Sequence, residues 1–139
     1  MTKIFIASSP EKINNNLKDF YNVLIEDKDI EVIHPTSIED IEDEKLKNIK
    51  VLDYEISRSD RLKILESDII ILDWDSEIRS AYLYWSCVNP KTKVVVVSRI
   101  FPNIDSFASE NIIATVKPEF VVNFIYSFLH SQEVASLDK

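Results

Sequence analysis

The chain contains no glycine in 139 residues, where average usage would give about ten. Dinucleotide-binding loops of the Gly-x-Gly-x-x-Gly type and Walker-type phosphate loops need residues without a Cβ, because their backbone wraps closely around phosphate groups. Both kinds of loop are therefore excluded. Any phosphate group that this protein binds must meet side chains or the N-terminus of a helix.

Cysteine and histidine are also scarce. Cys87 is the only cysteine, which excludes a disulfide framework and a cysteine-based zinc site. The two histidines, His34 and His130, are too few and too far apart in sequence to specify a metal site. We therefore expect no metal and no cofactor. Unpaired cysteine fits a reducing compartment, and no apolar run has the length of a signal sequence or a membrane span, so we expect a cytoplasmic protein without a membrane partner.

Acidic residues outnumber basic ones, with 24 Asp and Glu against 16 Lys and Arg and a net charge of −8. A field of this sign repels polyanions, so we expect no nucleic-acid polymer as a partner. The length and a hydrophobic content of 45% indicate one globular domain. We place it at residues 1–132 and expect a frayed C-terminal tail at residues 133–139.

Short runs rich in β-branched residues alternate with segments whose apolar residues recur every three or four positions. The pattern predicts strands at residues 3–7, 31–34, 69–72, 93–98 and 112–116, and helices at about residues 9–27, 51–67, 77–88 and 118–130. Continuous apolar strands such as residues 69–72 are typical of a parallel sheet that is covered on both faces. We predict an α/β protein with a flavodoxin-like three-layer α/β/α fold and a five-stranded, mainly parallel sheet.

Three acidic residues, Asp73, Asp75 and Glu77, follow the apolar strand at residues 69–72. Open parallel sheets bind ligands beyond the carboxyl ends of their strands, so these side chains lie where a site is expected. One interpretation is an acid and base pair, or a carboxylate that binds hydroxyl groups in a sugar or nucleotide pocket. The other is helix capping within a solvated acidic loop.

Polar side chains also follow the first two strands. Ser8 and Ser9 come after residues 3–7, where they either bind a phosphate group at a helix N-terminus or cap that helix. His34 ends the second strand, where it either exchanges protons with a ligand or fills a loop before Pro35.

Tyr82, Tyr84 and Trp85 make the helix at residues 77–88 unusually aromatic. A helix that starts beside a binding site can present such rings to a nucleobase. The alternatives are that they line a subunit interface or fill the core.

Two stretches of the sequence resemble the nucleoside 2-deoxyribosyltransferases and the related deoxynucleotide N-glycosidases. They are Lys3-Ile4-Phe5-Ile6-Ala7-Ser8-Ser9-Pro10 and Asp60-Arg61-Leu62-Lys63-Ile64-Leu65-Glu66-Ser67-Asp68-Ile69-Ile70-Ile71-Leu72-Asp73. The resemblance implies a nucleoside or nucleotide as the small-molecule partner, a homo-oligomer, and Asp73 as an acid in the binding pocket.

The same resemblance puts catalysis in question. The family's segment Asp-Ser-Gly-Thr-Ala-x-Glu aligns with Glu77-Ile78-Arg79-Ser80-Ala81-Tyr82-Leu83, which places Leu83 at the nucleophile position. A leucine cannot form a covalent glycosyl intermediate. The resemblance therefore implies retained nucleoside or nucleotide recognition, and cleavage or transfer of an N-glycosidic bond only if a carboxylate such as Glu77 or Asp75 takes over.

Two further residues belong to this hypothesis. Arg79, where the family has glycine, lies beside Ser80 near a helix start and can bind a monophosphate. Asn111 is the nearest counterpart of the Asn-x-Met-like segment that the family inserts from a neighbouring subunit. A site completed in this way is shared between subunits.

A signalling or interaction domain is the alternative from another class. Asp73, Ser98 and the pair Lys117-Pro118 resemble the phosphoacceptor, hydroxyl and lysine-proline positions of response-regulator receiver domains. Receivers place Mg²⁺-binding acids after the first strand, where this chain has Ser8-Ser9. A TIR-like module, suggested by Phe5-Ile6-Ala7-Ser8-Ser9 and the alternation of strands and helices, is the third possibility.

Overall fold

The computed structural model describes residues 1–8, 17–36, 49–75, 79–100 and 110–137. Its sheet contains β1 (Thr2–Ala7), β2 (Ile30–Ile33), β3 (Ile69–Asp73), β4 (Lys93–Val97) and β5 (Ile112–Val116). The strand order is β2-β1-β3-β4-β5, and every neighbouring pair is parallel. The predicted flavodoxin-like architecture is confirmed, and its sheet is parallel throughout.

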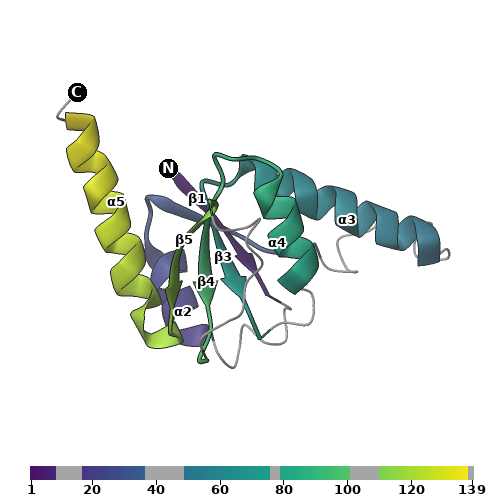
Figure 1. The fold of residues 1–139 in the computed structure, drawn as a ribbon, viewed down its shortest axis with the longest axis horizontal. Coiled ribbons are helices and arrows are strands. Elements are labelled where there is room, and N and C mark those ends of the chain that lie inside the picture. The colour runs from purple at the N-terminus through teal and green to yellow at the C-terminus, as the bar shows by residue number, and fades with distance from the viewer. Residues whose placement is uncertain (9–16, 37–48, 76–78, 101–109, 138–139) are drawn as a thin grey trace.

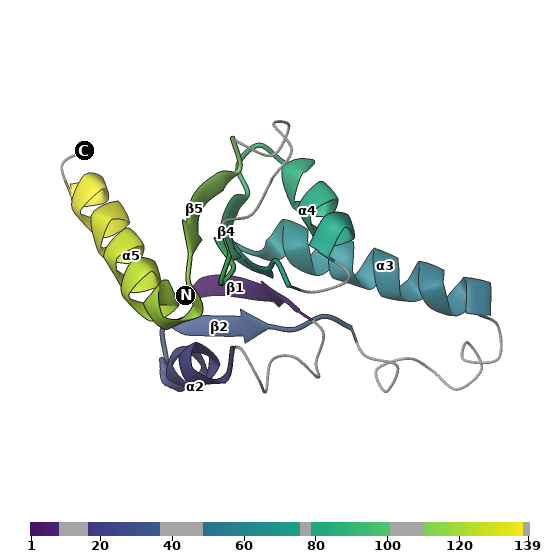
Figure 2. The ribbon, with the colours of Figure 1, turned by 60° about the horizontal axis from the view of Figure 1, so that its bottom comes forward.

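Helices cover both faces of this sheet. They are α2 (Lys18–Glu26), α3 (Ile49–Glu66), α4 (Arg79–Cys87), a 3-10 turn η4 (Pro118–Phe120) and α5 (Val121–Leu137). Helices α2 and α5 lie on one face, and α3 and α4 lie on the other (Figures 1 and 2). The N-terminal part of α3 extends beyond the sheet, on the side away from α5 (Figure 2).

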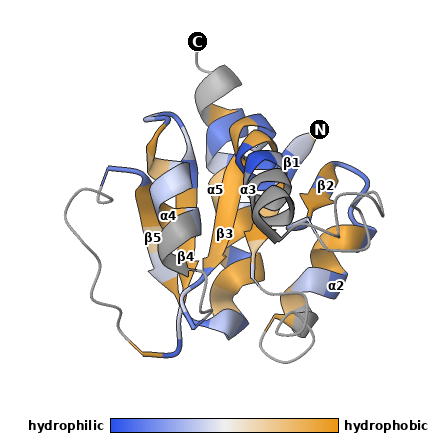
Figure 3. Cartoon of the chain, turned by 90° about the vertical axis from the view of Figure 1, so that its right-hand side faces the viewer, coloured by the Kyte–Doolittle hydropathy of each residue, from blue (hydrophilic) through white to orange (hydrophobic). Residues whose placement is uncertain are grey.

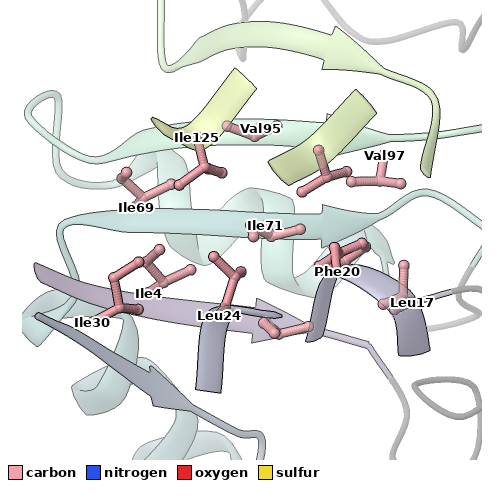
Figure 4. Packing of buried hydrophobic residues seen from close by; sticks show 12 residues of the cluster. Ile4, Leu17, Phe20, Leu24, Ile30, Ile69, Ile71, Val95, Val97 and Ile125 are labelled. Carbon is pink, nitrogen blue, oxygen red and sulfur yellow. The ribbon is translucent and has the colours of Figure 1, made fainter. Parts of the chain in front are cut away.

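The strands are apolar on both faces because each face is covered, and Figure 3 shows β3 and β4 as largely hydrophobic. Alternate residues of β1 separate into two cores: Ile4 and Ile6 pack toward α2 and α5, and Phe5 and Ala7 pack toward α3 and α4. Figure 4 shows the first core, in which Leu24 of α2 and Ile125 of α5 meet the sheet. Full burial of such a side chain contributes about 1.5–3 kcal/mol.

The observed elements agree with the expected ones, except at the ends of some helices. The first part of the helix expected at residues 9–27 and the start of the helix expected at residues 77–88 lie outside the described residues. The final helix runs to Leu137, so most of the segment expected as a frayed tail at residues 133–139 is helical. Glutamine, glutamate and alanine after Ser131 favour helix, and neither glycine nor proline follows to end it.

Among the helices that the structure describes, none is both long and apolar enough to cross a lipid bilayer.

Candidate functional site at the carboxyl edge of the sheet

The strand order places a topological switch point between β1 and β3. From β1 the chain moves outward to β2 on one side, and it then returns to place β3 on the other side. Ligands of open α/β sheets bind in the crevice that such a reversal leaves at the carboxyl ends of the strands. Ala7 pairs with Leu72 across this point, so Ser8 and Asp73 follow side by side at the edge.

Ser8 and Asp73 form a buried polar pair at this position. Their exposed fractions are 0% and 1%, and Ser8 Oγ donates a hydrogen bond of 3.1 Å to Asp73 Oδ2. The other carboxylate oxygen, Oδ1, accepts a hydrogen bond of 3.1 Å from the backbone N–H of Asp75. Both oxygens of Asp73 are thus held in fixed positions by the chain.

Of the three acids expected to act together, the structure describes Asp73 and Asp75, and these two lie in different environments. Asp73 is buried, whereas the side chain of Asp75 is exposed and its amide makes the short turn that ends β3. The turn is anchored because the backbone N–H of Trp74 donates to the carbonyl of Val97 on β4. Glu77 lies outside the described residues.

The predicted ligand-binding residues divide in the same way. Ser9 lies outside the described residues, and Arg79 and Ser80 form the first turn of α4, of which only the backbone is described. Asn111 precedes β5 at the opposite, amino edge of the sheet, where its amide Nδ2 donates to the carbonyls of Asn89 and Thr92, each at 2.9 Å. Within one chain, Asn111 is therefore separated from the Ser8–Asp73 pair by the length of the strands.

Tyr82 fills the core rather than the site, which corrects its expected role in stacking a base. Its ring is buried, packs against Phe5 and meets Trp85 edge to face at 5.3 Å between ring centroids. Tyr84 is the exposed aromatic residue of α4, at 62%. The sequence is aromatic on several sides of this helix, so it did not indicate which ring faces inward.

Leu83, which the resemblance aligns with the family's nucleophile, is also turned inward. Leu83 is buried in the core between the sheet and the helices α3 and α4. Cys87, at the end of the same helix, is partly buried, and burial raises the pKa of its thiol. Neither residue provides a nucleophile at the carboxyl edge.

Sequence reasoning missed a polar network centred on Asp60 of α3. Asp60 is 1% exposed, and its carboxylate accepts hydrogen bonds of 2.7 Å from the Tyr82 hydroxyl and from the backbone N–H of Thr36. Burial, followed by the Asp60 carboxylate, raises the pKa of Tyr82. The available signal was the placement of Asp60 four residues before Ile64, on the apolar face of the helix.

The network continues along the segment that leaves β2. Lys63 Nζ donates to the His34 carbonyl and to Thr36 Oγ1, both at 3.0 Å, and the Tyr21 hydroxyl lies 2.9 Å from His34 Nε2. Burial, followed by the positive charge of Lys63, lowers the pKa of His34. Its ring is therefore held between α2 and α3 in a setting that favours the neutral imidazole.

The receiver-like positions also lie at the carboxyl edge. Ser98 follows β4, where its backbone N–H donates to the carbonyl of Val116 and its Oγ donates to the carbonyl of Ile100 at 2.5 Å. Lys117 follows β5 and is exposed. Asp73, Ser98 and Lys117 thus end three adjacent strands.

Within the described ranges, no group of three histidine, cysteine, aspartate or glutamate side chains could hold a metal ion. No protein-family model matches the sequence, and no curated protein matches it significantly. The likeness to the deoxyribosyltransferases therefore depends on the two sequence stretches quoted above.

Proposed function

We propose that this protein binds a nucleoside or nucleotide at the carboxyl edge of its sheet, between β1 and β3. The observation that carries the proposal is the Ser8–Asp73 pair. A carboxylate costs free energy to bury, and the rest of β3 is apolar, so sheet packing alone does not explain an acid at this position. A fixed carboxylate suits the hydroxyl groups of a sugar and the amino groups of a base, because both donate hydrogen bonds.

The resemblance to the deoxyribosyltransferases supports the same ligand class, since it implies that Asp73, at the end of its second stretch, is an acid in the binding pocket. We propose binding without the family's covalent route, because Leu83 is apolar and packed in the core. A glycosidase that uses Glu77 or Asp75 instead is a separate outcome of the test below. We also retain the homo-oligomer that the resemblance implies as part of the proposal.

The test combines thermal shift with chromatographic detection of free base, using deoxynucleosides and deoxynucleoside 5′-monophosphates. Variants Ser8→Ala and Asp73→Asn remove the proposed contacts. Asp68→Asn is the matched control, because Asp68 precedes β3 at the amino edge and accepts a hydrogen bond from the backbone N–H of Lys3. Glu77→Gln tests the relocated carboxylate.

We expect a ligand-dependent rise in melting temperature that is lost in Asp73→Asn and kept in Asp68→Asn, without release of base. Release of base that disappears in Glu77→Gln would establish a glycosidase with a displaced carboxylate. The absence of any shift across the whole panel would overturn the nucleoside proposal.

A receiver-like signalling domain is the second candidate, favoured by Asp73, Ser98 and Lys117 at the ends of β3, β4 and β5. Its test is incubation with acetyl phosphate and Mg²⁺, followed by intact-mass spectrometry of the wild type and Asp73→Asn. A phosphoryl adduct that is absent from Asp73→Asn would favour this candidate. Burial of Asp73, and serine where receivers have Mg²⁺-binding acids after the first strand, place it second.

A further inference from the structure

Lys63 is a partly buried cation near the C-terminal end of α3, with neutral partners. Its ammonium group donates to the His34 carbonyl and to Thr36 Oγ1, and among the described residues it has no carboxylate partner. A lysine has three N–H donors, so the two neutral acceptors found among the described residues leave one donor for a further partner. This is notable in a chain whose acidic residues outnumber its basic ones by 24 to 16.

Two hydroxyl groups extend from this cation. Thr36 Oγ1 accepts the hydrogen bond from Lys63 and donates its own hydrogen to Ser59 Oγ at 2.8 Å. Because the Ser59 oxygen accepts that bond, its hydroxyl hydrogen points elsewhere. All three side chains are partly exposed, and Thr36 follows β2 at the carboxyl edge of the sheet.

The backbone beneath these groups is fixed by the buried Asp60. Its carboxylate accepts hydrogen bonds from the backbone N–H of Thr36 and from the Tyr82 hydroxyl, so both of its oxygens have partners on the buried side of α3. The positions of Thr36 and Lys63 are therefore set before any ligand arrives, which lowers the cost of binding.

We propose that Lys63, Thr36 and Ser59 form a binding site for a phosphate monoester. A lysine ammonium supplies a point charge for phosphate, and hydroxyl groups supply neutral hydrogen bonds to its oxygens. Because the chain has no glycine to build a backbone cradle, these contacts must come from side chains, as proposed here, or from a helix N-terminus.

The site deepens the proposed function and rests on it for the identity of the whole ligand. Strand β2 is the neighbour of β1, so Thr36 and Ser8 follow adjacent strands at one edge. A nucleotide with its sugar at the Ser8–Asp73 pair would then place its phosphate toward β2, rather than toward Arg79 at the start of α4.

His34 provides a spectroscopic reporter for this site. The titratable groups described beside its ring are Tyr21 from α2 and Lys63 from α3. The positive charge of Lys63 contributes to the lowered pKa of His34. A bound dianion offsets the charge of Lys63 and favours the imidazolium, so binding raises the pKa of His34. A purely structural Lys63 would not couple phosphate to this ring.

The experiment measures affinity by calorimetry for inorganic phosphate, deoxyribose 5-phosphate, a deoxynucleoside and its 5′-monophosphate. It compares the wild type with Lys63→Met, which keeps the length of the side chain, and with Lys63→Arg, which keeps the charge. Lys91→Met is the matched control, since Lys91 is an exposed lysine beside the amino edge. Melting curves establish that each variant is folded, and NMR follows the His34 ring during phosphate titration.

We expect Lys63→Met to lower the affinity for the phosphate esters at least about tenfold and to change the affinity for the deoxynucleoside little. We expect Lys63→Arg and Lys91→Met to retain most of the affinity for the phosphate esters. If Lys63→Met does not fold, Thr36→Val and the His34 titration carry the test. Equal affinity of wild type and Lys63→Met for phosphate esters, or a His34 signal that phosphate does not move, would overturn the site.

The outcomes separate this site from the proposed function. Binding of inorganic phosphate or deoxyribose 5-phosphate through Lys63, without binding of any nucleoside or nucleotide, would leave the anion site standing and remove the nucleoside proposal. Nucleoside and nucleotide binding that depends on Asp73 and is unchanged in Lys63→Met would leave the nucleoside proposal standing and remove the anion site.

Discussion

Asp60 shows how one buried charge connects three segments of this protein. Its carboxylate joins Thr36 after β2 to Tyr82 on α4. Among the described residues, no buried side-chain nitrogen or oxygen lacks a hydrogen-bond partner, so the charge is tolerated because its partners are in place.

Removal of the Tyr82 hydroxyl tests this account. We expect Tyr82→Phe to lower the free energy of unfolding by about 1–3 kcal/mol, because the buried Asp60 carboxylate loses one of its donors. The matched control is Tyr84→Phe on the same helix, which is exposed and should leave stability unchanged. Urea denaturation measures both, and an equal effect of the two substitutions would contradict the role given to Asp60.

The His34 ring predicts a pH dependence of stability. Its pKa in the folded protein lies below the ordinary value of 6.5, because of burial and then Lys63. Between these two pKa values the unfolded chain binds more protons, so stability falls as the pH drops from about 6.5 toward the folded value. Above this window the histidine has no effect.

Urea midpoints of the wild type and His34→Gln across this pH range isolate the contribution. We expect the wild type to lose more stability than His34→Gln as the pH falls. Parallel curves for the wild type and His34→Gln would show that the ring does not resist protonation.

At the scale of single elements, α4 determines what chemistry the carboxyl edge can perform. The helix turns Tyr82, Leu83 and Ser86 toward the interior and leaves Tyr84 exposed. Leu83, which the resemblance aligns with a catalytic glutamate, therefore faces an apolar core of aliphatic and aromatic side chains.

A carboxylate placed there should not restore an enzyme. We expect Leu83→Glu to destabilise the fold by more than about 3 kcal/mol, because it buries a charge among apolar groups and removes a packed leucine. Tyr84→Glu, on the exposed side of α4, should change stability little. Thermal melts and base-release assays on both variants decide the point; a stable Leu83→Glu that released base would place residue 83 in the site after all.

The elements that could be predicted from sequence were those with one dominant signal. Continuous aliphatic runs at residues 69–72 and 93–98 specified buried parallel strands. Helix α4 carried no such signal, because its aromatic residues Tyr82, Tyr84 and Trp85 lie on several sides of the helix. Which side is buried depends on how the helix packs against the sheet and α3. The buried position of Asp60 could have been predicted, because this charged residue lies on the apolar face of α3.

At the scale of the whole molecule, the site depends on strand order, which local sequence does not contain. Ser8 and Asp73 are 65 positions apart in the sequence and 3.1 Å apart in space. The prediction that polar residues after the strands share one edge followed from parallel topology alone. The position of Ser8 and Asp73 beside the reversal of strand order could be recognised only from the observed order of the strands.

The same strand order predicts where the fold is most resistant to opening. Every residue of β3 is buried and β3 pairs on both sides, whereas β5 is an edge strand without a fully buried residue. Local opening is easiest where few apolar contacts must break. We expect native-state hydrogen exchange at Ile70, Ile71 and Val95 to require global unfolding.

Amides of β5 and β2 should exchange through smaller openings, whose free energies respond less to urea. Hydrogen exchange measured by NMR over a series of low urea concentrations gives this ordering directly. Equal protection and equal urea dependence in β5 and β3 would mean that the edge opens only together with the centre of the sheet. The rigid support that β1 and β3 give to Ser8 and Asp73 would then extend over the whole sheet, and strand order would not determine where the fold opens first.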